Sequence, residues 1–218
     1  MKFENTEVFN FEGAIRGMRN PMNSWHLSDS YWDLDRYVIG ENDMGLAQRL
    51  IRGGSEHRKF LRQIFVSVDI TAPLYWWKEF DTYKIGTVAN STSTMHKITS
   101  KPITLDCFEI DDFEENLKFG CYTMRTISSV MIMGLEQLRQ KYLETEDKKY
   151  WKELIRWLPE SWLQTRTITM NYENLRNMYF QRKHHKLTEW TKSFIDWVES
   201  LPYAKELIMY VGDEKNNG

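Results

Sequence analysis

The chain has 218 residues, of which 41% are apolar and 28% charged, and its formal net charge is −2. This composition is typical of a globular protein, and the balanced charge excludes a global basic field for a nucleic acid polymer or an anionic membrane. No apolar run approaches the ~20 residues that span a bilayer, and the start, MKFENTEVFNFEG, lacks a signal-peptide core, so we expect a cytoplasmic protein.

Residues that bind metals or form disulfides are sparse. The two cysteines, Cys107 and Cys121, are too few for a disulfide framework or a four-cysteine zinc site, and we expect both to be core or strand residues. His184 and His185 would point about 100° apart on a helix, and the acidic run at 106–115 is typical of a solvated face. We therefore expect no metal site. Aromatic residues make up 14%, which fits either a core and subunit interface or a pocket for a planar ligand.

Two weak strand signals lie near the N-terminus, at Lys2–Phe11 and Tyr37–Ile39. Met44–Arg52 is predicted as a short helix, because two glycines that can end a helix follow it. Phe60–Ile70 is the best strand candidate, because its apolar residues alternate from position 64 to position 70.

The next segment has the signals of a helix start. Thr71 is a usable N-cap and Pro73 is tolerated in a first turn, so a helix is predicted from Pro73 to about Lys84, stopping at Gly86. Residues 87–96, TVANSTSTMH, are small and rich in hydroxyls, which predicts a loop.

Helical periodicity predicts two helices in the second half, at Tyr122–Leu143 and at Tyr150–Leu158, the latter ended by Pro159. Alternation predicts a strand at Trp162–Met170. The sequence therefore indicates an α/β (α+β) protein with a central, mostly antiparallel sheet flanked by helices.

The strongest helical pattern predicts one long helix over Asn171–Leu201. Its C-terminal part has apolar residues at steps of three and four, namely Leu187, Trp190, Phe194, Trp197 and Leu201. Extended backward, the stripe holds Asn171, Leu175, Met178 and Arg182. Asn171 and Arg182 would lie about 20° apart around the axis, so a partly buried guanidinium would need an anion or several acceptors. An ordinary ion pair with a carboxylate, or a place at the edge of the stripe, remains an alternative.

The same region resembles the C-terminal signature of the flavin-dependent thymidylate synthases. The matching positions between 159 and 182 are Pro159, Thr165, Thr169, Asn171, Leu175, Asn177 and Arg182. The resemblance implies that Asn171 and Asn177 contact the flavin and that Arg182 binds the nucleotide substrate as the catalytic residue. Glu153 and Arg156, matched with a one-residue gap, resemble a pair that the family uses at its flavin and nucleotide sites.

The N-terminal half matches in the same order, so that the resemblance covers roughly residues 44–97 and 149–210. His57 precedes the strand that ends at Ala72-Pro73, and Thr82-Tyr83-Lys84 stands where the family has its Arg-His-Arg motif. Two alignments of the following loop are possible. Without a gap, Thr87, Thr92 and Thr94 fall at the family's Ser, Ser and Arg; with one inserted residue, Asn90 and Ser93 restore its Asn and Ser, and Met95 replaces its Arg. Lys78, Lys97 and Arg58 are the cations nearby in the sequence that could compensate.

The resemblance implies a single domain over residues 1–218 that assembles as a homotetramer. It also implies a reductive methylation of dUMP to dTMP with FAD, methylenetetrahydrofolate and NADPH, without a cysteine nucleophile. The substrate-binding residues would be Arg156, Arg182, Lys84 and Ser93, and the cofactor-binding residues His57, Lys84, Asn90, Glu153, Asn171 and Asn177. Because the Arg-His-Arg motif is altered, two alternatives stay open. One is a homologue with a changed one-carbon reaction, and the other is a catalytically inactive binding or structural protein.

Overall fold

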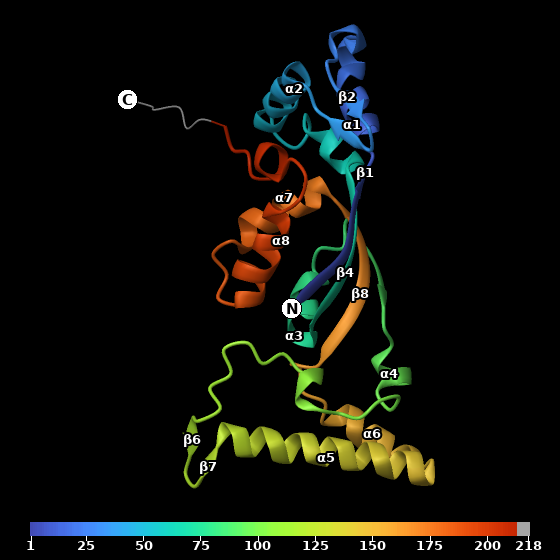
Figure 1. Ribbon diagram of the computed structural model, residues 1–218, viewed down its shortest axis with the longest axis vertical. Helices are drawn as coiled ribbons and strands as arrows, with labels where there is room; N and C mark the ends of the chain where they lie inside the picture. Colours follow the sequence, from blue (N-terminus) through green and yellow to red (C-terminus); the bar gives the residue numbers. More distant parts are fainter. Residues whose placement is uncertain (213–218) are drawn as a thin grey trace. The chain divides into compact units, whose positions relative to one another are not determined.

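The computed structural model describes residues 1–212, and these form two compact units that interleave along the chain (Figure 1). Unit 1 comprises Met1, Ile70–Thr82 and Asn90–Arg166. Unit 2 comprises Lys2–Asp69, Tyr83–Ala89 and the described residues from Thr167 onward. The single domain expected for the chain stays a prediction.

A central antiparallel sheet flanked by helices confirms the expected fold class. Its strand order is β1-β4-β8-β5, with β1 at Lys2–Phe9, β4 at Phe65–Pro73, β8 at Leu163–Asn171 and β5 at Val88–Ser91. The alternation that predicts β4 has the expected cause, because its inward side chains, from Val66 to Ala72, are fully buried. The predicted strands at Lys2–Phe11 and Trp162–Met170 are confirmed with small shifts.

The region around Pro73 differs from the prediction in three ways. The first residues of the expected strand form a 3-10 helix, η3 (Lys59–Gln63), and β4 continues through Thr71, which is therefore not an N-cap. Helix α3 (Leu74–Phe80) begins after Pro73, whose ψ of 153° is extended. It also ends four residues before Lys84, because a turn follows in which the Thr82 hydroxyl donates to a carbonyl of α3.

The hydroxyl-rich segment 87–96 is not a plain loop. It contains β5 and the first residues of a short helix, α4 (Thr94–Lys97). The Thr92 N–H donates to the carbonyl of Thr165 over 2.9 Å, and Ser93 caps α4 by accepting from the His96 N–H. Capping by side chains and pairing between strands provide hydrogen bonds for backbone groups of this segment. In the loop that its composition predicts, water would make those bonds.

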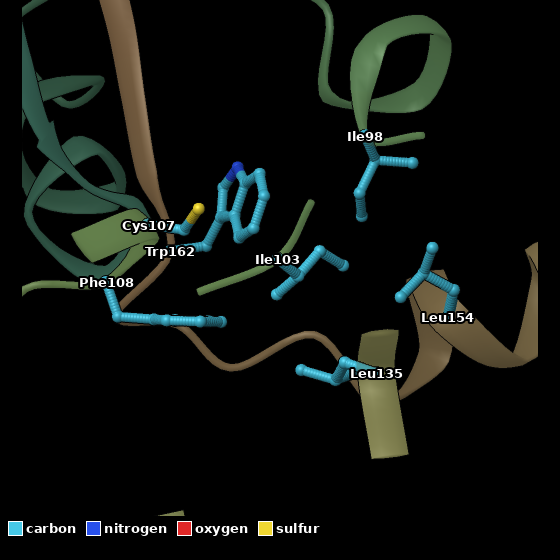
Figure 2. Close-up of a cluster of buried hydrophobic side chains, with 7 residues drawn as sticks. All are labelled: Ile98, Ile103, Cys107, Phe108, Leu135, Leu154 and Trp162. Atoms are coloured by element: carbon cyan, nitrogen blue, oxygen red, sulfur yellow. The ribbon is translucent and has the colours of Figure 1, made fainter. Parts of the chain in front are cut away.

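Unit 1 is built on two helices, α5 (Met124–Thr145) and α6 (Lys148–Arg156), which pack on each other (Figure 1). Both are predicted by periodicity, to within a few residues. Its core, shown in Figure 2, is a cluster of buried side chains from these helices and from the segments before and after them: Ile98, Ile103, Cys107, Phe108, Leu135, Leu154 and Trp162. The remaining elements are η4 (Leu105–Cys107), β6 (Lys118–Phe119) and β7 (Tyr122–Thr123).

The two cysteines of unit 1 have different surroundings. Cys107 is buried in the cluster of Figure 2, as expected of a core residue. Cys121 is exposed, so the expectation of a core or strand position is wrong for it. It follows Gly120, whose φ of 61° makes the tight turn between β6 and β7, and a turn tip buries no side chain. The acidic residues of 106–115 are exposed or half-buried, as predicted.

Unit 2 holds the N-terminal helices α1 (Phe11–Arg19) and α2 (Glu41–Arg52). A buried ion pair joins them, because Arg19 Nε lies 2.5 Å from Asp43 Oδ1. Burial opposes the charge on Asp43, but hydrogen bonds from two serine hydroxyls and Arg19 outweigh it and lower the pKa of Asp43. The short elements around these helices are η1 (Asn20–Met22), η2 (Trp25–Leu27), β2 (Tyr31–Asp33) and β3 (Arg36–Val38).

The long helix expected over Asn171–Leu201 is wrong, because the chain forms three separate elements there. These are α7 (Tyr172–Arg182), a π-helix η5 (Glu189–Phe194) and α8 (Ile195–Glu199), and a second π-helix, η6 (Ala204–Ile208), follows them. The break holds the polar run KHHK, and His185 Nδ1 accepts from the Leu187 N–H over 3.1 Å, which replaces a helical hydrogen bond. The apolar stripe is buried nonetheless, with Trp190 and Phe194 fully covered.

Candidate functional site

The residues that the sequence offers as a site fall in both units. His57, Lys84, Asn171, Asn177 and Arg182 belong to unit 2. Asn90, Ser93, Glu153 and Arg156 belong to unit 1. Each group is described within its own unit.

In unit 2, Asn171 is the N-cap of α7 and not a helical residue, so the predicted stripe does not pair it with Arg182. Its side chain accepts from the N–H of Asn174 over 3.0 Å, and Asn174 Oδ1 accepts in return from the Asn171 N–H. Asn174 also donates to the carbonyl of Ile85 over 2.6 Å. The start of α7 is thereby tied to the turn at 83–87.

Gly86 is the residue that allows this close approach. Its φ is 79°, and a Cβ placed on it would lie 2.9 Å from Oδ1 of Asn174 and 3.0 Å from Nδ2 of Asn171. Sequence reasoning identifies Gly86 only as a helix stop and misses Asn174. The N-x-x-N spacing of a capping box, at 171 and 174, is the signal that could have found it.

Three further predicted residues of unit 2 have exposed side chains. Asn177 lies on α7, Lys84 in the turn before β5, and His57 between α2 and η3 with its ring against Gly53. Within residues 1–212, the side chains of Asn177, Lys84 and His57 have no hydrogen bond or ion pair to protein groups. They are therefore available as donors to a ligand.

Arg182, the last residue of α7, is partly buried beside two rings. Its Nε donates to the hydroxyl of Tyr83 over 2.8 Å. Its Cζ lies 5.4 Å from the centre of the Tyr83 ring and 4.9 Å from that of Trp190. Tyr83 is therefore a direct partner of Arg182, and the sequence carried no sign of that contact.

Two of the three cations expected as possible replacements for the motif, Arg58 and Lys78, already have partners. Arg58 Nε lies 2.9 Å from a carboxylate oxygen of Glu173 in unit 2, and Lys78 lies 2.6 Å from Glu160 in unit 1. Lys97 is exposed and makes no ion pair with the described residues. The chain thus uses Arg58 to hold α7 in place.

In unit 1, Glu153 and Arg156 form an ion pair on α6, and the Trp157 indole donates to the other oxygen of Glu153 over 3.1 Å. The Ser93 hydroxyl caps α4 and lies 2.7 Å from His96 Nδ1. Asn90 is exposed on β5. The structure thus pairs Glu153 with Arg156 and Ser93 with His96, and within residues 1–212 no hydrogen bond or ion pair joins these two pairs or links the Asn90 side chain to either of them.

Two classes of site find no support in the described part of the chain. Residues 1–212 contain no cluster of three or more His, Cys, Asp or Glu side chains that could hold a metal ion. None of the helices that they form combines the length and the apolar character that a bilayer crossing demands.

Comparisons with known proteins locate the fold. No protein-family model matches the sequence, and no curated protein matches it. Among solved structures, the chain is similar to the flavin-dependent thymidylate synthase ThyX from Helicobacter pylori complexed with FAD and dUMP. The TM-score is 0.69 at 18% identity, over 97% of this chain and 100% of the other. A second structure of Helicobacter pylori ThyX with FAD and dUMP gives 0.65 at 19% identity, over 93% and 94%. These similarities establish the fold.

Proposed function

We propose that this protein is an FAD-dependent, thymidylate synthase-like enzyme that reductively methylates dUMP to dTMP, with methylenetetrahydrofolate as carbon donor and NADPH as reductant. The observation that carries the proposal is the similarity of fold over nearly the whole of both chains to structures that contain FAD and dUMP. The spacing of Asn171, Asn177 and Arg182 in the sequence supports it independently.

The donors of unit 2 fit FAD. Lys84 and His57 are exposed donors suited to its phosphates, and Asn177 offers an unpaired amide for the polar edge of a flavin ring. Asn171 would contact the flavin from its capping position. Within unit 1, Asn90 and Glu153 are the residues that the resemblance assigns to the cofactor. Bound FAD supplies hydride chemistry, which no side chain of the protein can provide.

The nucleotide would be held by cations and one hydroxyl. Arg182 would bind the substrate and stabilise charge that develops on it, while Arg156 and Lys84 would contact the phosphate. Ser93 would donate to the phosphate by exchanging its bond with His96. The protein's contribution is then to hold and orient the reactants and to exclude water.

Two alternatives differ in how much of this chemistry survives. In the first, the protein binds FAD and nucleotide but transfers another one-carbon group. In the second, it is an inactive binding or structural protein. One observation favours these two alternatives over the full reaction. Tyr83 stands where the resemblance expects a cationic motif, and its hydroxyl accepts a hydrogen bond from Arg182.

The proposal is tested on the purified protein in three steps. A flavin absorption band, or saturable binding of added FAD, is expected first. dTMP should then form from dUMP, methylenetetrahydrofolate and NADPH under anaerobic conditions. FAD and dUMP binding without dTMP formation would favour the first alternative, and no FAD binding at high micromolar concentration would favour the second.

The resemblance also implies a homotetramer, which we expect light scattering to show. A monodisperse monomer would contradict the proposed assembly.

A further inference from the structure

We infer that Tyr83 is a positioning residue for Arg182, which it holds in one orientation for an anionic nucleotide with the help of Trp190. The inference rests on the proposed function for the identity of the nucleotide. It concerns the Tyr83–Arg182 contact that this chain has in place of a cationic motif.

The Tyr83 hydroxyl forms hydrogen bonds to two neighbouring residues of α7. It accepts from Arg182 Nε over 2.8 Å and donates to Oε1 of Gln181 at 2.9 Å. Accepting from one residue and donating to the next fixes the direction of the hydroxyl proton. The bond to Nε in turn restricts rotation of the guanidinium about its long side chain.

Two aromatic rings restrict the plane of the guanidinium further. Trp190 is fully buried, and its ring centre lies 6.3 Å from that of Tyr83. Arg182 Cζ lies within ~6 Å of both centres, the range in which a cation is attracted to a ring. Trp190 belongs to the π-helix η5, and such irregular turns occur frequently at functional sites.

The backbone that carries Tyr83 is itself anchored. The Thr87 hydroxyl donates to the Tyr83 carbonyl, and Asn174 donates to the Ile85 carbonyl over 2.6 Å. Gly86 allows the turn to lie against the N-cap of α7. Tyr83 therefore reaches Arg182 from a turn that is tied to the start of the same helix, so the orientation is set before a ligand arrives.

In this arrangement a single guanidinium with a fixed orientation binds the anion, in place of several cations with mobile side chains. A planar guanidinium binds an anion through two parallel N–H bonds, and holding it still lowers the entropy lost on binding. Lysine cannot replace it, because an ammonium has neither the planar shape nor the Nε–H that Tyr83 accepts. Tyr83→Phe removes only the hydroxyl and keeps the ring, which makes it the informative variant.

The experiment is a double-mutant cycle on the full-length protein with Tyr83→Phe, Arg182→Lys and the double variant. For each, the Kd for FAD, the Kd of the FAD-loaded protein for dUMP and the melting temperature are measured. Tyr122→Phe is the matched control, because Tyr122 is exposed on β7 and its hydroxyl has no hydrogen-bond partner within residues 1–212.

We expect Tyr83→Phe to weaken dUMP binding about tenfold, as the loss of one hydrogen bond to a charged group predicts. FAD binding should stay within about twofold, and Tyr122→Phe should change neither Kd. The double variant should bind dUMP no more weakly than Arg182→Lys alone, because both substitutions disrupt the same Tyr83–Arg182 contact. Unchanged dUMP affinity in Tyr83→Phe, or losses that multiply, would overturn the inference.

If the wild-type protein binds no dUMP, the proposed function is wrong, and the melting temperatures then decide the inference alone. Shifts in melting temperature that fail to add support the positioning contact. Shifts that add within error show that Tyr83 and Arg182 act independently and overturn it.

Discussion

Arg58 Nε lies 2.9 Å from Oε2 of Glu173, in the first turn of α7. Glu173 is 7% exposed, so this carboxylate is largely removed from water and depends on Arg58 for compensation. Its place near the positive end of the helix dipole adds to its stability. The pair fixes the direction in which α7 leaves β8, and with it the positions of Asn177 and Arg182.

Arg58→Ala should lower the free energy of unfolding by about 2–3 kcal/mol, somewhat less than the ~3–5 kcal/mol for breaking a fully buried pair, because Arg58 is partly exposed. Urea denaturation measures the change. Arg49→Ala, an exposed arginine on α2 with no ion pair among the described residues, is the control and should change it little. Equal effects of the two variants would show that the pair does not hold α7.

Gly86→Ala should destabilise the protein by about 1–2 kcal/mol, because φ is positive and the new Cβ meets the two capping asparagines. Gly45→Ala is the matched control. Gly45 lies within α2 with nothing within 4 Å of a new Cβ, so this variant should gain up to about 1 kcal/mol. Thermal or urea unfolding measures the stability of both variants. We expect Gly86→Ala to be less stable than the wild type and Gly45→Ala to be more stable.

Glu136 predicts a pH dependence. Hydrogen bonds from Arg139 outweigh partial burial and, with the Ile103 N–H, lower the pKa of Glu136 from 4.5 to about 2. A lowered folded-state pKa stabilises the protein above the unfolded value of 4.5, and this contribution is lost as pH falls toward 2. The stability difference between wild type and Glu136→Gln should therefore be largest above pH 5 and shrink steadily below it.

Denaturant unfolding at a series of pH values measures that difference. Glu144→Gln removes an exposed glutamate of the same helix and serves as the control, because an exposed ion pair contributes little. A gap between wild type and Glu136→Gln that stays constant from pH 6 to pH 3 would contradict the assignment.

Arg182→Ala should weaken dUMP binding by about 2–4 kcal/mol while the protein still folds, because alanine favours helix and no large core volume is lost. Arg182→Lys should recover little of that loss. Calorimetric titration and a melting curve on the same variant decide the matter. A lowered melting temperature with unchanged dUMP affinity would make Arg182 a structural residue.

Periodicity predicted strands β4 and β8 and helices α5 and α6 closely. In β4 the alternation comes from burial of one face, whereas many apolar residues of α5 are exposed in the structure. Helix α1 escaped notice because Gly13 and Gly17 weaken its helical signal, and both are accommodated close to other side chains. The long helix over 171–201 failed because periodicity records which side faces the core, and it does not record whether the backbone between the turns is continuous.

The amino-acid sequence by itself determined the fold class and most of the elements, because these depend on local periodicity. It also supplied the polar residues that the family resemblance names as candidates for binding a flavin and a nucleotide. Only the tertiary structure decided which of these residues are already used by the protein. The exception is Asn171, which is used by its helix cap, as the local N-x-x-N spacing already indicates. Arg58 is paired with Glu173, and Arg182 is bonded to Tyr83. These two pairings join residues up to 115 positions apart, and no local pattern specifies them, because they depend on how packed elements bring distant side chains together.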